Sequence, residues 1–120
     1  MDKHIVTNYD NDLEYIKNMI IEMGVLLEKQ MFQAVELIKV SNKEVNLNII
    51  ESEKKIDISE KKIREYATNT LSKRQPLADD LRKIIVSIKL ATTFERIGDH
   101  STNIANRIEI AKVVPSSYTT

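Results

Sequence analysis

The stretch LEYIKNMIIEMGVLLEKQMFQAVELI, residues 13–38, decides the fold. Apolar side chains recur along it at steps of three and four residues, at Leu13, Ile16, Ile20, Met23, Leu27, Met31, Ala34 and Ile38. This spacing puts them along one side of an α-helix as a nearly heptad seam, which must pack against another element. We therefore predict a first helix over residues 10–40, with Asp10 or Asp12 as its N-terminal cap.

Two further segments continue the helical period. A second helix is predicted over residues 43–71, where the seam is weaker and more polar and consists of Val45, Ile49, Ser52, Ile56, Ser59, Ile63 and Tyr66 or Ala67. Pro76 then breaks the pattern, because proline cannot continue a helix but suits the first turn of a new one. A third helix is predicted over residues 77–112, with its seam at Ile84, Ala91, Phe94, Ile97, Ile104, Ile108 and Ala111.

The composition favours long helices joined by short turns, since the 120 residues include only two glycines and two prolines. We predict the all-α class, as an antiparallel up-down-up three-helix bundle that forms one domain over residues 10–112. Residues 1–9 are expected to be a flexible N-terminus and residues 113–120 a C-terminal tail.

Charge and cysteine content exclude several classes of function. The eighteen basic and eighteen acidic residues cancel, which argues against a nucleic-acid partner. The absence of cysteine excludes a disulfide framework, a cysteine-type zinc site and a thiol nucleophile. No apolar run is long enough for membrane insertion and none follows the N-terminus as in a signal peptide, so we expect a soluble, cytoplasmic protein.

Glu95 and Asp99 are the sharpest candidate site. They lie one helical turn apart, they continue an apolar row of the third helix, and no basic residue stands one turn before or after them. Like charges at this spacing repel, and a hard cation would offset the repulsion because carboxylate oxygens are its preferred ligands. The alternative is an ordinary solvated pair at the edge of a buried face. Asn103, one turn beyond Asp99, could orient a ligand through a hydrogen bond.

A second acidic pair, Glu53 and Asp57, has the same spacing in the second helix. If the two helices are neighbours, four carboxylates could face each other, which is how helical bundles build metal sites. The alternative is a solvated helix face, because Asp57 with Lys61 and Glu60 with Arg64 have the spacing of favourable ion pairs. The sequence leaves the metal open between iron, zinc, manganese and magnesium.

Three basic residues, Lys73, Arg74 and Arg82, gather around the turn before the third helix. They could contact an anion or an acidic partner, and the alternative is a solvated loop. No spacing of serine, histidine and aspartate suggests nucleophilic catalysis, and the paired Glu-x-x-His of di-iron bundle oxidases is absent. We therefore do not expect an enzyme.

Four stretches together resemble the PhoU family of phosphate-uptake regulators. They are His4-Ile5 with Leu13-Glu14, Met23-Gly24, Glu28 and Gln30; Glu51 to Asp57; Lys73 to Pro76 with Asp80 to Arg82; and Glu95 to Asp99 with Asn103-Ile104. The resemblance implies a fold of two three-helix bundles, each with an E(D)-x-x-x-D motif that binds metal clusters in some members. It implies a non-enzymatic negative regulator that contacts the phosphate ABC transporter and the sensor histidine kinase of phosphate-starvation signalling.

The chain departs from the family pattern because it holds a single bundle of the N-terminal type. A lone bundle would leave an apolar face uncovered, so we expect a homo-oligomer. Our hypothesis is a metal-binding adaptor of phosphate transport with Glu95 and Asp99 as ligands, supplemented by Glu53 and Asp57. The rivals are a metal-free helical interaction module and a carboxylate-bridged metalloenzyme, and the missing ligand histidines argue against the last.

Overall fold

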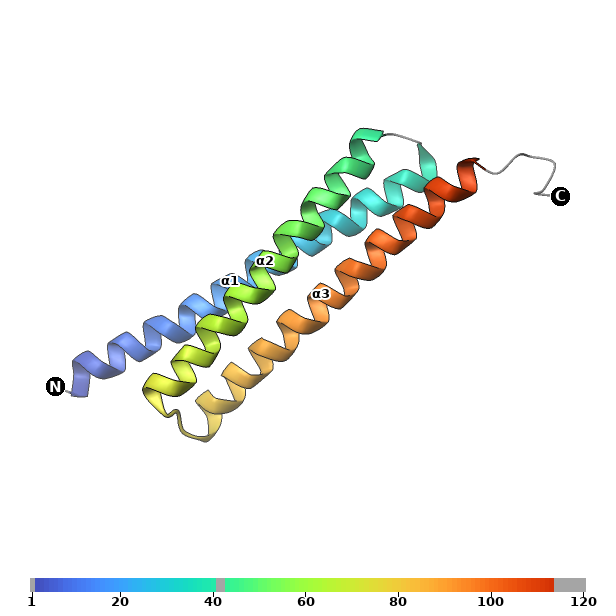
Figure 1. Cartoon of the computed structure of the whole chain (residues 1–120). Helices are drawn as coiled ribbons and strands as arrows, with labels where there is room; N and C mark the ends of the chain where they lie inside the picture. Colours follow the sequence, from blue (N-terminus) through green and yellow to red (C-terminus); the bar gives the residue numbers. More distant parts are fainter. Residues whose placement is uncertain (1, 41–42, 114–120) are drawn as a thin grey trace.

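Three long helices make up the bundle in the computed structural model, which describes the backbone of residues 2–40 and 43–113 and the side chains of residues 10–40 and 43–111. They are α1 (Asp2–Lys39), α2 (Lys43–Arg74) and α3 (Ala78–Val113), and each contacts the other two. The chain runs up through α1, down through α2 and up again through α3, so α1 and α3 are parallel (Figure 1). The predicted all-α three-helix bundle is confirmed.

The first helix begins at Asp2, eight residues before the predicted start. Residues 2–9 contain neither proline nor glycine, so nothing in the sequence interrupts the helix before residue 10. The segment predicted as a flexible terminus is therefore helical from residue 2. Asp10 and Asp12 lie inside α1, and the predicted cap was wrong. Of the predicted tail, Val113 ends α3 and residues 114–120 lie outside the described residues.

The turn between α2 and α3 confirms the break at Pro76. Gln75 adopts a left-handed conformation, with φ of 44°, and its N–H donates to the carbonyl of Leu71 at 3.3 Å. This is the arrangement that commonly ends an α-helix. The carbonyl of Leu77 then accepts the N–H of Leu81 at 2.9 Å and opens α3. Two aspartates follow in the first turn, where the helix dipole favours negative charge.

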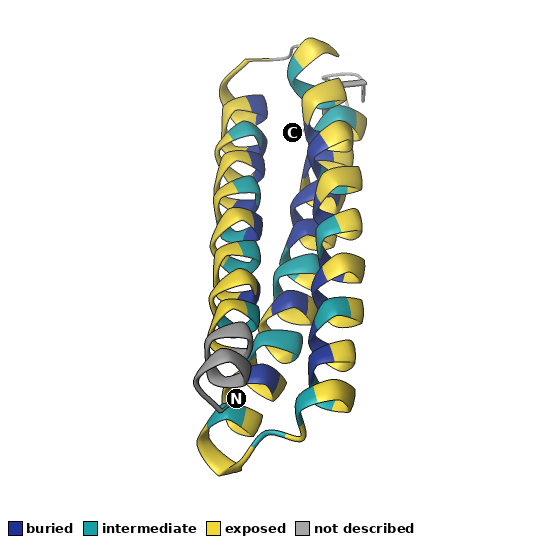
Figure 2. Ribbon diagram, turned by 90° about the vertical axis from the view of Figure 1, so that its left-hand side faces the viewer, coloured by how far each residue is buried: buried dark blue, intermediate teal, exposed yellow. Residues whose placement is uncertain are grey.

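The core follows the inner faces of the helices in three layers (Figure 2). Their buried members are Ile16, Ala67 and Ile84; Met23, Leu27, Ile56, Ile63 and Ala91; and Ala34, Leu37, Ile49 and Ala105. Within the described part of the chain, no helix is both long enough and apolar enough to span a bilayer.

The predicted seams of α1 and α3 drift off the core toward their C-terminal ends. Met31 and Ile38 are 46% and 64% exposed, and Gln30 and Leu37 are buried in their place. Ile104 is likewise 49% exposed, while Ala105 is buried. The buried positions keep a seven-residue repeat, at Ile16, Met23, Gln30 and Leu37 of α1 and at Ile84, Ala91, Gly98 and Ala105 of α3, as expected for helices that wind around each other at 3.5 residues per turn. The predicted seams left this repeat by one position.

Candidate functional site

The candidate site is an acidic cluster between α2 and α3, which consists of Glu53, Asp57 and Glu60 of α2 and Glu95 and Asp99 of α3. The two helices are antiparallel, so the earlier residues of α2 lie beside the later residues of α3. Glu53 accordingly interacts with Asp99, and Glu95 with Glu60 and Asp57. The structure thus brings all four sequence-predicted carboxylates together.

Burial, together with neighbouring like charges, raises three pKa values in the acidic cluster. Burial is the main cause of the raised pKa of Glu53, followed by a hydrogen bond with Asp99. Burial also raises the pKa of Asp57, and the charges of Asp99 and Glu60 add to it. For Glu95 burial again raises the pKa most, with further contributions from the charges of Glu60, Asp57 and Asp99. The folded protein therefore holds these carboxylates at an electrostatic cost.

Basic side chains do little to relieve this crowding. Among the ion pairs of the described residues, the only one that reaches the acidic cluster joins Glu60 to Arg64, at 3.7 Å and on the same helix. None of those pairs involves Glu53, Asp57, Glu95 or Asp99, and the pairing of Asp57 with Lys61 is not formed. The carboxylates are therefore available to an external cation.

The acidic cluster offers the right donors for a hard cation but no ready-made cage. Its donor atoms are all carboxylate oxygens, which suit magnesium, manganese and iron. Across the described side chains, however, no three Asp, Glu or His groups are arranged as a metal site. The carboxylates would have to turn toward a common point to hold an ion.

Glu60 is the member of the acidic cluster that the sequence analysis did not propose as a ligand. It is 7% exposed and stands one turn after the buried Ile56, so it occupies a core position of α2. A carboxylate on the apolar seam is the signal that could have identified it. Asn103, proposed to orient a ligand, is exposed one turn beyond Asp99. Its proposed role stays a prediction.

Two of the three predicted basic residues, Arg74 and Arg82, have acidic partners within the chain. The Nε of Arg74 lies 3.2 Å from Oδ2 of Asp12, whose Oδ1 accepts a hydrogen bond of 2.6 Å from the Tyr66 hydroxyl. This bond is the main cause that raises the pKa of Tyr66 to about 12. Arg82 pairs with Asp79 at 2.7 Å on the surface, and Lys73 is exposed. Arg74 therefore ties α2 to α1, and the contact with an anion or partner stays a prediction.

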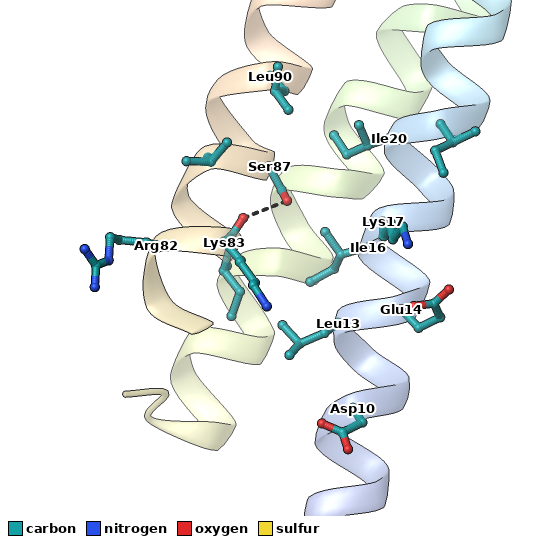
Figure 3. A pocket seen from close by; sticks show the side chains of 13 residues that line it. Asp10, Leu13, Glu14, Ile16, Lys17, Ile20, Arg82, Lys83, Ser87 and Leu90 are labelled. Atoms are coloured by element: carbon teal, nitrogen blue, oxygen red, sulfur yellow. Dashed lines mark hydrogen bonds between the residues drawn. The ribbon is translucent and has the colours of Figure 1, made fainter. Parts of the chain in front are cut away.

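A separate apolar groove follows the face between the parallel helices α1 and α3. Its larger hollow has a volume of about 810 Å³ and is lined by apolar residues that include Leu13, Ile20 and Leu90. In Figure 3, Leu13 and Ile16 point into the space between the helices, and Arg82 points away from α1. A second hollow of about 360 Å³ lies further along the same two helices, around Phe32 and Phe94.

Comparison with known proteins gives a consistent result. The family model described as "PhoU domain" matches residues 20–108, which include the whole acidic cluster. The chain is 39% identical over 115 residues to the "Phosphate-specific transport system accessory protein PhoU homolog" of Zymomonas mobilis. These residues cover 96% of this chain and 48% of the relative. The corresponding homologue of Rhizobium meliloti is 37% identical over 105 residues, which cover 88% of this chain and 44% of the relative.

The protein named "Phosphate-specific transport system accessory protein PhoU" of Escherichia coli is 32% identical over 99 residues, which cover 82% of this chain and 41% of the relative. The chain thus spans about half the length of the curated relatives it matches. No solved structure gives a significant match. Since the family model covers most of the chain and these relatives agree with it, the chain belongs to the PhoU family.

Proposed function

We propose that this chain regulates phosphate transport as an accessory protein in the cytoplasm. The observation that carries the proposal is the family match over residues 20–108, together with relatives named as accessory proteins of the phosphate-specific transport system. On this proposal, the bundle contacts the phosphate ABC transporter and the sensor histidine kinase, and it dampens phosphate-starvation signalling without catalysing a reaction.

We further propose that the acidic cluster binds a metal ion such as iron, zinc, manganese or magnesium. Glu95 and Asp99 would be its main ligands, with Glu53 and Asp57 as supplements. The support is the meeting of acidic side chains of α2 and α3, where burial first and like charges second raise the pKa of Glu53, Asp57 and Glu95. The ion would neutralise the negative charge of the carboxylates. Because its ligands come from both helices, it would also hold α2 and α3 in register.

Elemental analysis and calorimetric titration with Mn²⁺ test this site. Glu95→Gln and Asp99→Asn keep the side-chain shape but remove the charge, so we expect each to weaken Mn²⁺ binding at least tenfold. Glu51→Gln is the matched control, because Glu51 is an exposed glutamate of α2 that pairs with Lys55 at 3.9 Å outside the acidic cluster. Equal Mn²⁺ content and affinity in all four proteins would eliminate the site.

A metal-free interaction module is the second candidate, and the lack of a preformed cage among the described side chains favours it. The two candidates differ in their response to a chelator. If metal shapes the surface offered to the transporter, then EDTA and Glu95→Gln both weaken capture of the purified transporter. A metal-free module binds the transporter equally well with and without EDTA.

The predicted self-association would use the apolar face between α1 and α3. Because Arg82 is paired with Asp79, the charges left along the larger hollow are Lys17 and Lys83 against Asp10 and Glu14, while the smaller hollow is lined by Glu28. An antiparallel second copy would set Lys17 and Lys83 of one chain toward Glu28 of the other. We therefore propose a second copy of this chain as the occupant.

Light scattering at micromolar concentration tests the dimer. Phe32→Asp places a charge on this face, at a side chain that is 68% exposed, and should give a monomer. Ile58→Asp is the control, because Ile58 is a similarly exposed apolar residue of α2 that lines neither hollow. A wild-type protein that is already monomeric would refute the proposal.

A further inference from the structure

A buried polar contact joins α1 to α3 directly behind the acidic cluster. Gln30 is fully buried, although its side chain is an amide on the seam of α1. Its Nε2 donates a hydrogen bond of 3.0 Å to the hydroxyl of Thr102, which is 8% exposed on α3. Burying these polar groups is unfavourable unless they are hydrogen-bonded, so their placement in the core requires an explanation.

Thr102 also faces the acidic cluster. It forms a hydrogen bond with Glu53, which lowers the pKa of Glu53 against the larger effects that raise it, so the hydroxyl favours the ionised carboxylate. A threonine hydroxyl has one proton and two lone pairs. Because Gln30 donates to a lone pair of the oxygen, the proton of Thr102 is free to point at Glu53.

The other end of the Gln30 amide lies against α3 at Gly98. Its Oε1 is buried and has no hydrogen-bond partner in the described structure. It lies beside Gly98, where an added Cβ would stand only 3.2 Å from it. Gly98 lies between Glu95 and Asp99 in α3, so the bare backbone of the acidic motif makes room for the amide.

We propose that Gln30 and Thr102 are positioning residues of the acidic cluster: the buried amide orients the Thr102 hydroxyl, which holds Glu53 beside Asp99. α1 is thereby connected to a surface built by α2 and α3 alone. The effect on cation affinity rests on the proposed metal site, whereas the coupling between the three side chains does not.

A double-mutant cycle in EDTA tests the coupling without any metal. Thr102→Val keeps the shape of the side chain and removes the hydroxyl, and Glu53→Gln removes the charge that it faces. We expect their combined effect on the unfolding equilibrium constant to differ from the product of the single effects by at least threefold. The control pair is Thr70→Val with Glu53→Gln, since the buried Thr70 hydroxyl donates instead to the carbonyl of Tyr66. Additivity in both pairs would overturn the proposal.

Titration with Mn²⁺ then measures the consequence at the cluster. We expect Thr102→Val and Gln30→Met to weaken Mn²⁺ binding about three- to tenfold, Thr102→Ser to restore it, and Thr70→Val to leave it unchanged. Wild-type affinity in folded Thr102→Val would overturn the positioning role. If the wild type binds no Mn²⁺, the metal site fails, and the double-mutant cycle alone decides whether Gln30 and Thr102 position Glu53.

Discussion

Asp12 and the acidic cluster place negative charge in two opposite environments within one bundle: beside hydrogen-bond donors at Asp12, and beside other carboxylates in the cluster. Each carboxylate oxygen of Asp12 accepts from a donor on α2, one from Tyr66 and the other from Arg74. In the acidic cluster, by contrast, carboxylates of α2 and α3 face one another, and the pKa values of Glu53, Asp57 and Glu95 are raised by burial and by the neighbouring charges. The first arrangement stabilises the contact between two helices. The second stores repulsion that only protonation, mutation or an external cation can relieve.

The two arrangements predict stability changes of opposite sign when an acidic side chain is removed. Removing an acid that has donors leaves those donors unpaired and should destabilise the fold. Removing an acid that faces other acids relieves repulsion and should stabilise it. Removal of a negative charge is therefore expected to lower stability at Asp12 of α1 and to raise it at Glu95 of α3.

The largest effect is expected for Asp12→Ala. It removes the acceptor of both Tyr66 and Arg74, and the ion-paired side chains are only 20% and 26% exposed. Leaving part-buried donors unpaired costs roughly 1–3 kcal/mol, so we expect the free energy of unfolding to fall by about 2 kcal/mol in urea denaturation. Asp79→Ala is the control, because the pair of Asp79 with Arg82 is exposed and its loss should cost at most about 0.5 kcal/mol. Equal losses in both variants would contradict the role given to Asp12.

A smaller effect with the opposite sign is expected for Glu95→Gln. In EDTA, the neutral amide removes repulsion with Glu60, Asp57 and Asp99, so the free energy of unfolding should rise by about 0.5 kcal/mol. Glu51→Gln, which removes the acid of an exposed pair with Lys55, should produce no gain. Destabilisation by Glu95→Gln in EDTA would mean that the acidic cluster is neutralised within the chain.

How far the sequence predicted these two regions depends on the range of the interactions. Local periodicity was sufficient for the fold, since the α2 positions Ile49, Ile56 and Ile63 are all buried as expected. It was also sufficient to bring the two E-x-x-x-D pairs together once α2 and α3 were predicted to be antiparallel. It could not assign Asp12, which was interpreted as a helix cap, because its partners lie 54 and 62 residues away.

The sequence analysis missed Glu60 as a member of the acidic cluster for a different reason. Its spacing from Arg64 suggested a solvated ion pair, and that pair does form. However, the position of Glu60 on the seam of α2 buries its side chain at the same time. The spacing of Glu60 and Arg64 identifies one partner on the same helix, whereas the burial of Glu60 depends on how the whole of α2 is rotated against α3. Only the second determines whether the carboxylate faces Glu95.

The smallest effect is the dependence of stability on pH. The pKa values of Glu53, Asp57 and Glu95 are raised in the folded protein, so between their ordinary values near 4 and the raised values the folded state binds more protons than the unfolded state. Stability in EDTA should therefore increase as the pH falls from 7 to about 5, by a few tenths of a kcal/mol. Above the raised pKa values these groups give no further change.

The double variant Asp57→Asn/Glu95→Gln isolates the source of that slope. It removes two of the three groups with raised pKa values, whereas Glu53 keeps its burial and its contact with Asp99, so the stability of the variant should change less between pH 7 and 5 than that of the wild type. Asp12→Ala, in contrast, should keep the wild-type slope in this range, because the acidic cluster is intact in that variant. A flat wild-type profile, or a slope in the double variant as steep as that of the wild type, would show that the folded protein relieves the repulsion within the acidic cluster by another route.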